Sequence, residues 1–142
     1  TFSTGFGVGI GISASVFPRG AETAFVDPVA QYDHDEGNAI GSGFVYRGRG
    51  IPALQGKYVA ADIVKGRLFY FDLADLPDAP VQLKSLRVDI NGKVQPLLDA
   101  VGYQNTYDPG SKRADLRLGI DEQGELYLLT KGDGWIRKLV AP

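Results

Sequence analysis

Residues 39–73, AIGSGFVYRGRGIPALQGKYVAADIVKGRLFYFDL, predict the architecture of the chain more clearly than any other segment. Three short runs stand out within it, GSGFVYRG, GKYVAAD and GRLFYFDL, and each begins at a glycine. Alternating or apolar runs bounded by glycines are typical of β-strands. Only residues 62–65 separate the second run from Gly66, so the second and third strands are expected to form an antiparallel hairpin.

The same pattern returns near the C-terminus, in residues 124–139, GELYLLTKGDGWIRKL. Placed on residues 56–71, it matches both glycines, the apolar strand between them and an aliphatic residue after the second glycine. The copies are 68 residues apart, more than the roughly 40–50 residues of one propeller blade. Residues 82–90 are expected to form the outermost strand of the first blade, and Asn91-Gly92, a strong hairpin signal, to be the turn that follows it. Residues 99–115 supply the expected insertion, a loop by composition. Repeated antiparallel sheets of this kind favour a β-propeller.

The length of the chain limits how much of a propeller it can form. Its 142 residues, 44% of them hydrophobic, suit about one domain. A propeller typically needs at least about four blades, whereas two clear ones are visible, at about 38–90 and 93–140. We therefore expect residues 1–142 to be the C-terminal part of one propeller domain, with the remaining blades of the same propeller as partner.

Charge and composition exclude several classes of function. The net charge of −2 comes from 15 basic and 17 acidic residues scattered along the chain, with no basic stripe, so nucleic acid is not an expected partner. No apolar run reaches the roughly 18 residues of a membrane span. Cysteine is absent, which excludes disulfides and thiolate chemistry. Within residues 5–16, the first eight alternate glycine with an apolar residue, which indicates a strand with one bare face rather than a dinucleotide loop.

The densest polar cluster is residues 32–36, Tyr-Asp-His-Asp-Glu. In a propeller, the segment leading into a blade's innermost strand and the hairpin between its second and third strands emerge on the same face. The cluster is therefore expected beside residues 63–65, and the next blade adds residues 103–115 and 131–133. Convergent polar groups at a concave mouth form the default hypothesis for a site.

Within this cluster, His34 is the only histidine of the chain and hence the candidate general base near neutral pH. A loop histidine hydrogen-bonded to a neighbouring carboxylate is the alternative. The carboxylates of Asp33, Asp35 and Glu36 are candidate ligands for Ca²⁺, which prefers several oxygens from flexible loops. Their spacing does not complete an EF-hand, so a solvated acidic turn is the alternative interpretation.

Cations and aromatics elsewhere at the expected mouth suit an acidic or sugar ligand. Lys65 and Arg113 are candidates for binding the carboxylates of a cofactor or an acidic sugar, and the arginine can do so through two parallel hydrogen bonds. Simple surface solubility is the alternative for each. Tyr103 and Tyr107, in the insertion, are candidates for stacking on a sugar ring.

Residues 28–73 carry the motifs PV-x-x-Y-x-H, G-x-VYRG, IP-x-L-x-G-x-Y-x-x-x-D and GRL. In these motifs the chain resembles the late blades of the glucose/sorbosone dehydrogenase family of propellers. Residues 115–139, DLRLGIDEQGELYLLTKGDGWIRKL, are similar to the closing blade of that family.

The resemblance implies a chemistry. Family members that oxidise sugars hold pyrroloquinoline quinone (PQQ) and Ca²⁺ on the top face, and a histidine from an earlier blade takes the substrate proton. Lys65 lies in the hairpin where the lysine that contacts the quinone is expected. Arg113 and Arg117 lie near the start of the final inner strand, where the family has paired arginines.

We therefore expect an all-β protein, the C-terminal two to three four-stranded antiparallel blades of a six-bladed propeller. The expected function is oxidation of a sugar at the top face, in a secreted or periplasmic protein. The rival is a propeller polysaccharide lyase, with His34 or Tyr32 as base and a cation near the uronate. A non-catalytic propeller that binds a glycan is the third possibility.

Overall fold

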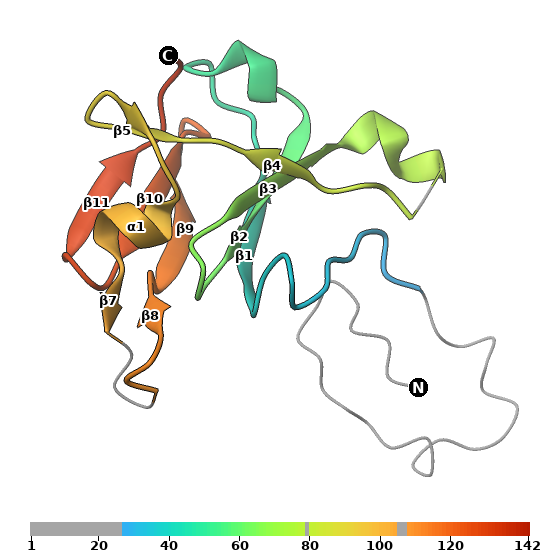
Figure 1. Ribbon diagram of the computed structural model, residues 1–142. Coiled ribbons are helices and arrows are strands. Elements are labelled where there is room, and N and C mark those ends of the chain that lie inside the picture. Colours follow the sequence, from blue (N-terminus) through green and yellow to red (C-terminus); the bar gives the residue numbers. More distant parts are fainter. Residues whose placement is uncertain (1–26, 79, 105–107) are drawn as a thin grey trace, which may run out of the picture.

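The fold is mostly β-structure, arranged in several small antiparallel sheets (Figure 1). A computed structural model describes residues 27–78, 80–104 and 108–142. The strand expected within residues 5–16 and the candidate Tyr107 lie outside these described residues. All statements below on structure concern the described part of the chain.

The first sheet has four strands and contains the sequence quoted first above. It consists of β1 (Ile40–Val45), β2 (Lys57–Asp62), β3 (Leu68–Asp72) and β4 (Lys84–Leu86), paired in that order and all antiparallel. The 3-10 helix η3 (Pro52–Leu54) lies between β1 and β2, and η4 (Leu73–Asp78) follows β3. The predicted β2–β3 hairpin is confirmed.

The second sheet has three strands, in the order β11-β10-β9, and again all neighbours are antiparallel. They are β9 (Leu116–Ile120), β10 (Leu126–Thr130) and β11 (Trp135–Lys138). No fourth strand pairs with β11 among the described residues, so one edge of this sheet carries unpaired backbone groups there.

The β2–β3 and β10–β11 hairpins are equivalent in turn geometry, as the repeat predicts. Gly56 and Gly124, each just before the first strand, have φ of 73° and 80°, a left-handed conformation that favours glycine. Gly66 and Gly134, in the turns, have φ of 67° and 71°. Gly66 donates its N–H to the carbonyl oxygen of Asp62 at 3.2 Å, and Gly134 donates its N–H to the carbonyl oxygen of Thr130 at 3.0 Å.

The segment between the two sheets differs from the expected long strand and structureless insertion. Instead of one strand over residues 82–90, short β4 is followed by β5 (Asp89–Ile90), which pairs with β6 (Lys93–Val94) across the predicted Asn91-Gly92 turn. Residues 99–115 contain the end of helix α1 (Leu97–Val101) and the hairpin of β7 (Tyr103–Gln104) with β8 (Lys112–Arg113). Composition missed these elements because each is too short to show a period.

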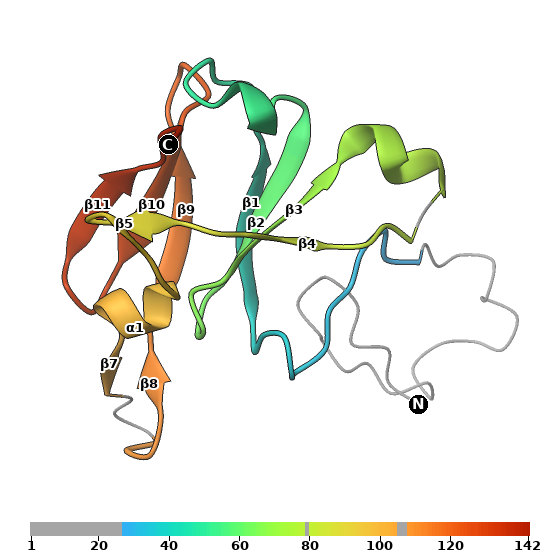
Figure 2. The ribbon, with the colours of Figure 1, turned by 45° about the horizontal axis from the view of Figure 1, so that its top comes forward.

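The main core lies between the two sheets, where β1 and β2 approach β9 (Figures 1 and 2). The first sheet contributes one alternating face and the second sheet contributes the leucines of β9 and β10. Helix α1 closes one side through Leu97 and Val101. The fully or nearly fully buried members include Val59, Ala61, Leu68, Leu116, Leu118, Leu126 and Leu128. The opposite face of the first sheet has a smaller cluster of its own, around Ala30, Phe71 and Val81.

A buried carboxylate joins the two sheets at the start of β10. Glu125, 7% exposed, accepts hydrogen bonds from the Tyr46 hydroxyl at 2.7 Å and from the backbone N–H groups of Arg49 and Gly50, both at 2.9 Å. The Tyr46 oxygen in turn accepts the N–H of Ile51 at 2.8 Å. These hydrogen bonds, led by that from Tyr46, hold the pKa of Glu125 below its usual range.

The glycines of the same loop are required by close approach. A β-carbon on Gly48 would lie 2.7 Å from the carboxyl carbon of Glu125, and one on Gly50 would lie 2.9 Å from a carboxylate oxygen. The RGRG sequence therefore lets the backbone approach the buried carboxylate closely enough to donate to it.

Removing the Tyr46 hydroxyl should destabilise the fold. Tyr46→Phe leaves the Ile51 N–H without its acceptor and takes one donor from Glu125, so we expect a loss of about 1–3 kcal/mol in the free energy of unfolding. Chemical denaturation measures it. Tyr70→Phe is the matched control, because the Tyr70 ring contact with Lys57 does not need the hydroxyl. Equal stability of the two variants would contradict the assigned role of Tyr46.

Candidate functional site

The loops at one end of the two sheets gather around the turn of the β2–β3 hairpin (Figure 1). Two carbonyls of this turn, those of Ile63 and Val64, accept the N–H groups of Leu116 and Ala114 at 3.0 Å and 2.8 Å. The segment leading into β9 is therefore attached to the turn. Gly66 packs on Ala114 so closely that an added β-carbon would lie 2.8 Å from it.

Asp62, the last residue of β2, attaches the polar segment 32–39 to the same turn. Its carboxylate is fully buried. One oxygen accepts the N–H groups of Asn38 and Ala39, at 2.6 Å and 2.8 Å, and the Tyr32 hydroxyl at 3.1 Å. The other accepts the N–H of Lys65 at 2.5 Å. A charge buried in this way is compensated by four donors, and it fixes where residues 32–39 lie.

Tyr32 is held as a hydrogen-bond donor rather than as a base. Its ring stacks on Phe69, with ring centres 5.1 Å apart and planes 21° apart. Burial, together with the negative charge of Asp62 and the hydrogen bond to it, raises the pKa of the Tyr32 hydroxyl well above its usual value. A role as general base would therefore require the bond to Asp62 to be given up.

The acidic turn is stabilised by hydrogen bonds between its own residues. One oxygen of the Asp33 carboxylate accepts the N–H groups of Asp35 and Glu36, at 2.9 Å and 3.2 Å. All three acidic side chains are exposed. In the described part of the chain, no group of three or more His, Cys, Asp or Glu side chains lies together as metal ligands would. The residues expected to bind Ca²⁺ are thus not gathered into one site.

Lys65 and His34 come together, as the sequence predicts, although their contact involves the backbone. The Lys65 ammonium donates to the carbonyl oxygens of His34 at 3.0 Å and Asp35 at 2.9 Å. Arg67 donates to the carbonyl of Glu36. The His34 side chain is exposed to solvent, whereas the backbone of its turn is held by the hydrogen bonds from Lys65 and Arg67.

Arg113 belongs to a second cluster, around Asp115. Its Nε and Nη2 lie 3.1 Å and 2.7 Å from one oxygen of Asp115, and the Tyr103 hydroxyl donates to the other oxygen. The hydrogen bond to Asp115 raises the pKa of Arg113. Burial opposes ionisation of Asp115, yet the hydrogen bonds from Tyr103 and Arg113 hold its pKa below the usual range. Asp115 has φ of 46°, an uncommon conformation outside glycine.

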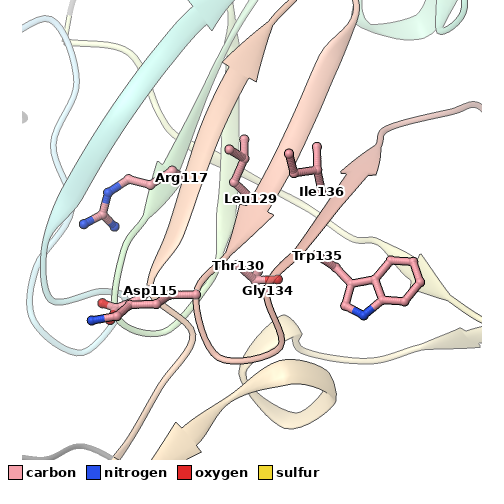
Figure 3. Close-up of a pocket in the computed structure, with 8 residues that line it drawn as sticks. Asp115, Arg117, Leu129, Thr130, Gly134, Trp135 and Ile136 are labelled. Carbon is pink, nitrogen blue, oxygen red and sulfur yellow. The ribbon is translucent and has the colours of Figure 1, made fainter.

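Arg117 lies along an open groove of about 400 Å³, which Lys65 does not line (Figure 3). Its neighbours across the sheet are Leu129 and then Ile136, and the three side chains form a row. Asp115 and Lys131 also line this groove. The predicted cations therefore fall into two clusters. Arg113 and Arg117 lie around Asp115, whereas Lys65 lies at the turn of His34.

Three acidic residues that organise this end and the sheet junction were not singled out from the sequence: Asp62, Asp115 and Glu125. Asp62 was visible only as the final residue of the motif G-x-Y-x-x-x-D. An acid at the end of an apolar strand, directly before a turn, is a signal that could have indicated Asp62. Asp115 and Glu125 carry no such local signal, because their partners lie elsewhere in the chain.

No protein-family model matches this chain, and no solved structure matches it. No helix within residues 27–78, 80–104 and 108–142 is long and apolar enough to cross a membrane.

The turn of the second hairpin should show a measurable acid dependence. A hydrogen bond from Arg137 lowers the pKa of Asp133 to about 2 from 3.8, and Thr130 also donates to its carboxylate. A lowered pKa stabilises the fold above about pH 4, and this contribution is lost as the pH falls through 2. The stability difference between the protein and its Asp133→Asn variant should thus be constant above pH 4 and shrink between pH 4 and 2.

Denaturation at a series of pH values measures this difference. Arg137→Gln removes the main cause of the lowered pKa of Asp133. The stability difference between the protein and this variant should therefore also shrink between pH 4 and 2. A difference that does not change between pH 5 and 2 would contradict the assignment.

Proposed function

We propose that this chain forms the late blades of a secreted β-propeller that acts on carbohydrate, oxidising a sugar at the end of the sheets where the loops gather. The observation that carries the proposal is the convergence of polar loops from two packed antiparallel sheets, around the turn of β2 and β3. The resemblance to glucose/sorbosone dehydrogenases supplies the reaction and PQQ as the cofactor.

The repeat supports the propeller part of this proposal. Val59 and Ala61 lie on the face of the first sheet that packs against the second. Their equivalents, 68 residues later, are Tyr127 and Leu129, on the opposite face of the second sheet from its buried leucines. That face is only half-buried, and the neighbouring Ile136 is 64% exposed. By the repeat, it is the face that a further sheet would cover, as in successive blades.

The cations present fit a cofactor that carries carboxylates. Lys65 uses two donors on backbone carbonyls, which leaves the third N–H of its ammonium group. Arg113 uses two of its five N–H donors on Asp115. Arg117 is exposed on its groove. We infer that all three cations contribute to binding the quinone, Lys65 from the turn that presents His34, and Arg113 and Arg117 from the cluster around Asp115.

PQQ, when bound, supplies the electron acceptor of the reaction. The residues of this chain position the participants. The hydrogen bond between Tyr32 and Asp62 fixes the turn that presents His34, and Lys65 holds the backbone of that turn through two hydrogen bonds. Among the described residues, the carboxylates expected to hold Ca²⁺ do not lie together, and the proposed reaction gives that ion no step.

A polysaccharide lyase is the second candidate function. It is favoured by the exposed imidazole of His34, which stands on a turn whose backbone is held by Lys65 and by the carboxylate of Asp33. An accessible imidazole on a turn whose backbone is held in this way suits a general base that takes a proton next to a uronate carboxylate. A glycan-binding propeller without activity is the third candidate.

Two substitutions in the full-length protein distinguish these functions. For a quinone enzyme, Lys65→Ala should weaken PQQ binding, while His34→Ala should have the smaller effect on aldose oxidation. For a lyase, His34→Ala should lower turnover about 10²-fold or more and leave substrate binding mostly intact. Reduction of an artificial electron acceptor and the ultraviolet absorbance of unsaturated uronate measure the two reactions.

Asn38→Ala is a control, because only its backbone N–H contacts Asp62. Small and equal losses from His34→Ala and Lys65→Ala would mean that neither residue is in the site. Binding of a glycan without either reaction would leave the glycan-binding function.

The 142-residue chain alone should self-associate or be unstable, because the Tyr127 and Leu129 face and the β11 edge would be uncovered. Ile136→Lys should reduce this association, since it places a charge on that face. Val140→Lys is the matched control, because Val140 is 67% exposed and lies beyond β11. Analytical ultracentrifugation measures the association, and a monomer with a single cooperative unfolding transition would contradict the propeller proposal.

A further inference from the structure

The outer edge of β11 presents backbone groups in a defined order (Figure 2). Along an antiparallel ladder, residues that bond the neighbouring strand alternate with residues whose N–H and C=O groups point away from it. The N–H of Leu139 bonds the carbonyl oxygen of Leu126 at 2.8 Å, so residues 135, 137 and 139 are those that face β10. The N–H and C=O groups of Ile136 and Lys138 therefore point outward, and no strand among the described residues pairs with them.

The charges of β11 do not guard this edge. Exposed edge strands commonly carry charged side chains, lysine above all, that oppose pairing with another chain. Here both cations are directed back over their own sheet. Arg137 donates to the Thr130 hydroxyl at 2.9 Å and forms an ion pair with Asp133. The Lys138 ammonium lies 5.9 Å from the centre of the Tyr127 ring, on β10. The edge is thus open to a further strand.

The sequence of β11 suits a second copy of itself in one register. Two identical antiparallel strands are related by a two-fold axis, and directly opposite residues share a face of the sheet, so the axis passes through one residue. An axis at Arg137 or at Lys138 would place like charges directly opposite each other, which is destabilising. An axis at Trp135 would oppose the strand to the hairpin turn of residues 131–134.

An axis at Ile136 avoids these costs. It places Ile136 opposite its own copy, in a hydrogen-bonded pair, and Trp135 opposite Arg137 of the second copy. An apolar pair and an aromatic–cation pair are both favourable across strands. Ile136 and Trp135 are each 64% exposed, so this register also covers apolar surface.

We propose that β11 pairs with β11 of a second copy of this chain, in the register centred on Ile136. The product is a two-fold symmetric dimer in which the two three-stranded sheets form one continuous sheet. The contact uses the edge of the sheet and leaves the face of Tyr127 and Leu129 to a further blade. The proposal therefore does not depend on the proposed function.

Disulfide cross-linking tests the pairing and its register, because the chain has no cysteine of its own. Opposite residues of a hydrogen-bonded antiparallel pair have Cα atoms about 5.5 Å apart, within the range of roughly 4.4–6.8 Å that a disulfide spans. Ile136→Cys in the intact protein should therefore form a covalent dimer under mild oxidation, which a non-reducing gel detects.

Lys138→Cys is the matched control for this cross-link. Lys138 is exposed on the same face of the same strand, yet its two copies would lie roughly 14 Å apart, four residues along the pair. We expect at least tenfold more covalent dimer from Ile136→Cys than from Lys138→Cys. Equal yields, or no covalent dimer from Ile136→Cys, would overturn the proposal.

Two further variants separate pairing through the edge from association through the face. Ile136→Pro removes an outward N–H and leaves the β10 ladder intact, because proline is tolerated on an edge strand where the N–H faces solvent. Ile136→Thr keeps that N–H and the branched shape. Analytical ultracentrifugation should show dimer affinity at least tenfold weaker for Ile136→Pro than for Ile136→Thr, and equal affinities would overturn the proposal.

Trp135 is the only tryptophan of the chain and reports the same pairing. Its fluorescence emission should shift to shorter wavelength as the concentration of the unsubstituted protein rises, because the second copy covers its exposed ring. Ile136→Pro should show no such shift. A shift of the same size in Ile136→Pro would contradict the assignment of the contact to the edge.

Discussion

The packing of the second sheet's leucines against β1 and β2 is the interaction on which the rest of the structure depends. Two small antiparallel sheets, of four and three strands, each bury one face against the other. Leu116, Leu118, Leu126 and Leu128 provide the second sheet's part of this core. Their burial fixes the spacing of the loops at both ends, because strands pack as rigid elements.

Two buried carboxylates then set those loops, one at each end of the sheets. Glu125 accepts donors from the loop between β1 and β2, and Asp62 accepts donors from residues 32–39 and from the hairpin turn. Both acids lie next to the apolar core, so their donors have to be in place for the charge to be tolerated. The same hydrogen bonds that compensate these charges therefore give the site loops a defined position.

The positions of the cations show how structural and functional roles can share a residue. Lys65 supports the backbone of the turn that presents His34, and Arg113 orients Asp115 at the margin of the groove. In the proposed reaction these residues would bind an anion with the donors that remain.

Local sequence patterns were enough to predict three strands of the first sheet and the two equivalent hairpins. Alternation over residues 39–73 identified β1, β2 and β3, and the glycine spacing identified the equivalence of the two hairpins, because left-handed turns and strand period are local properties. The sequence also predicted that Lys65 lies beside the turn of His34, because residues 32–36 and 63–65 are expected to emerge on the same face of a propeller. The expectation of a single strand over residues 82–90 was wrong, because pairing with β3 is limited to three residues before the chain leaves for β5.

Only the tertiary structure decided which polar groups meet. The partners of Glu125 are 75 to 79 residues away, and those of Asp62 in the loop of Tyr32 are 23 to 30 residues away. Such contacts follow from how the sheets pack, which no local pattern encodes. Likewise, the separation of Arg117 from Lys65 depends on which face of β9 is buried, because neighbouring residues of a strand point to opposite faces of its sheet.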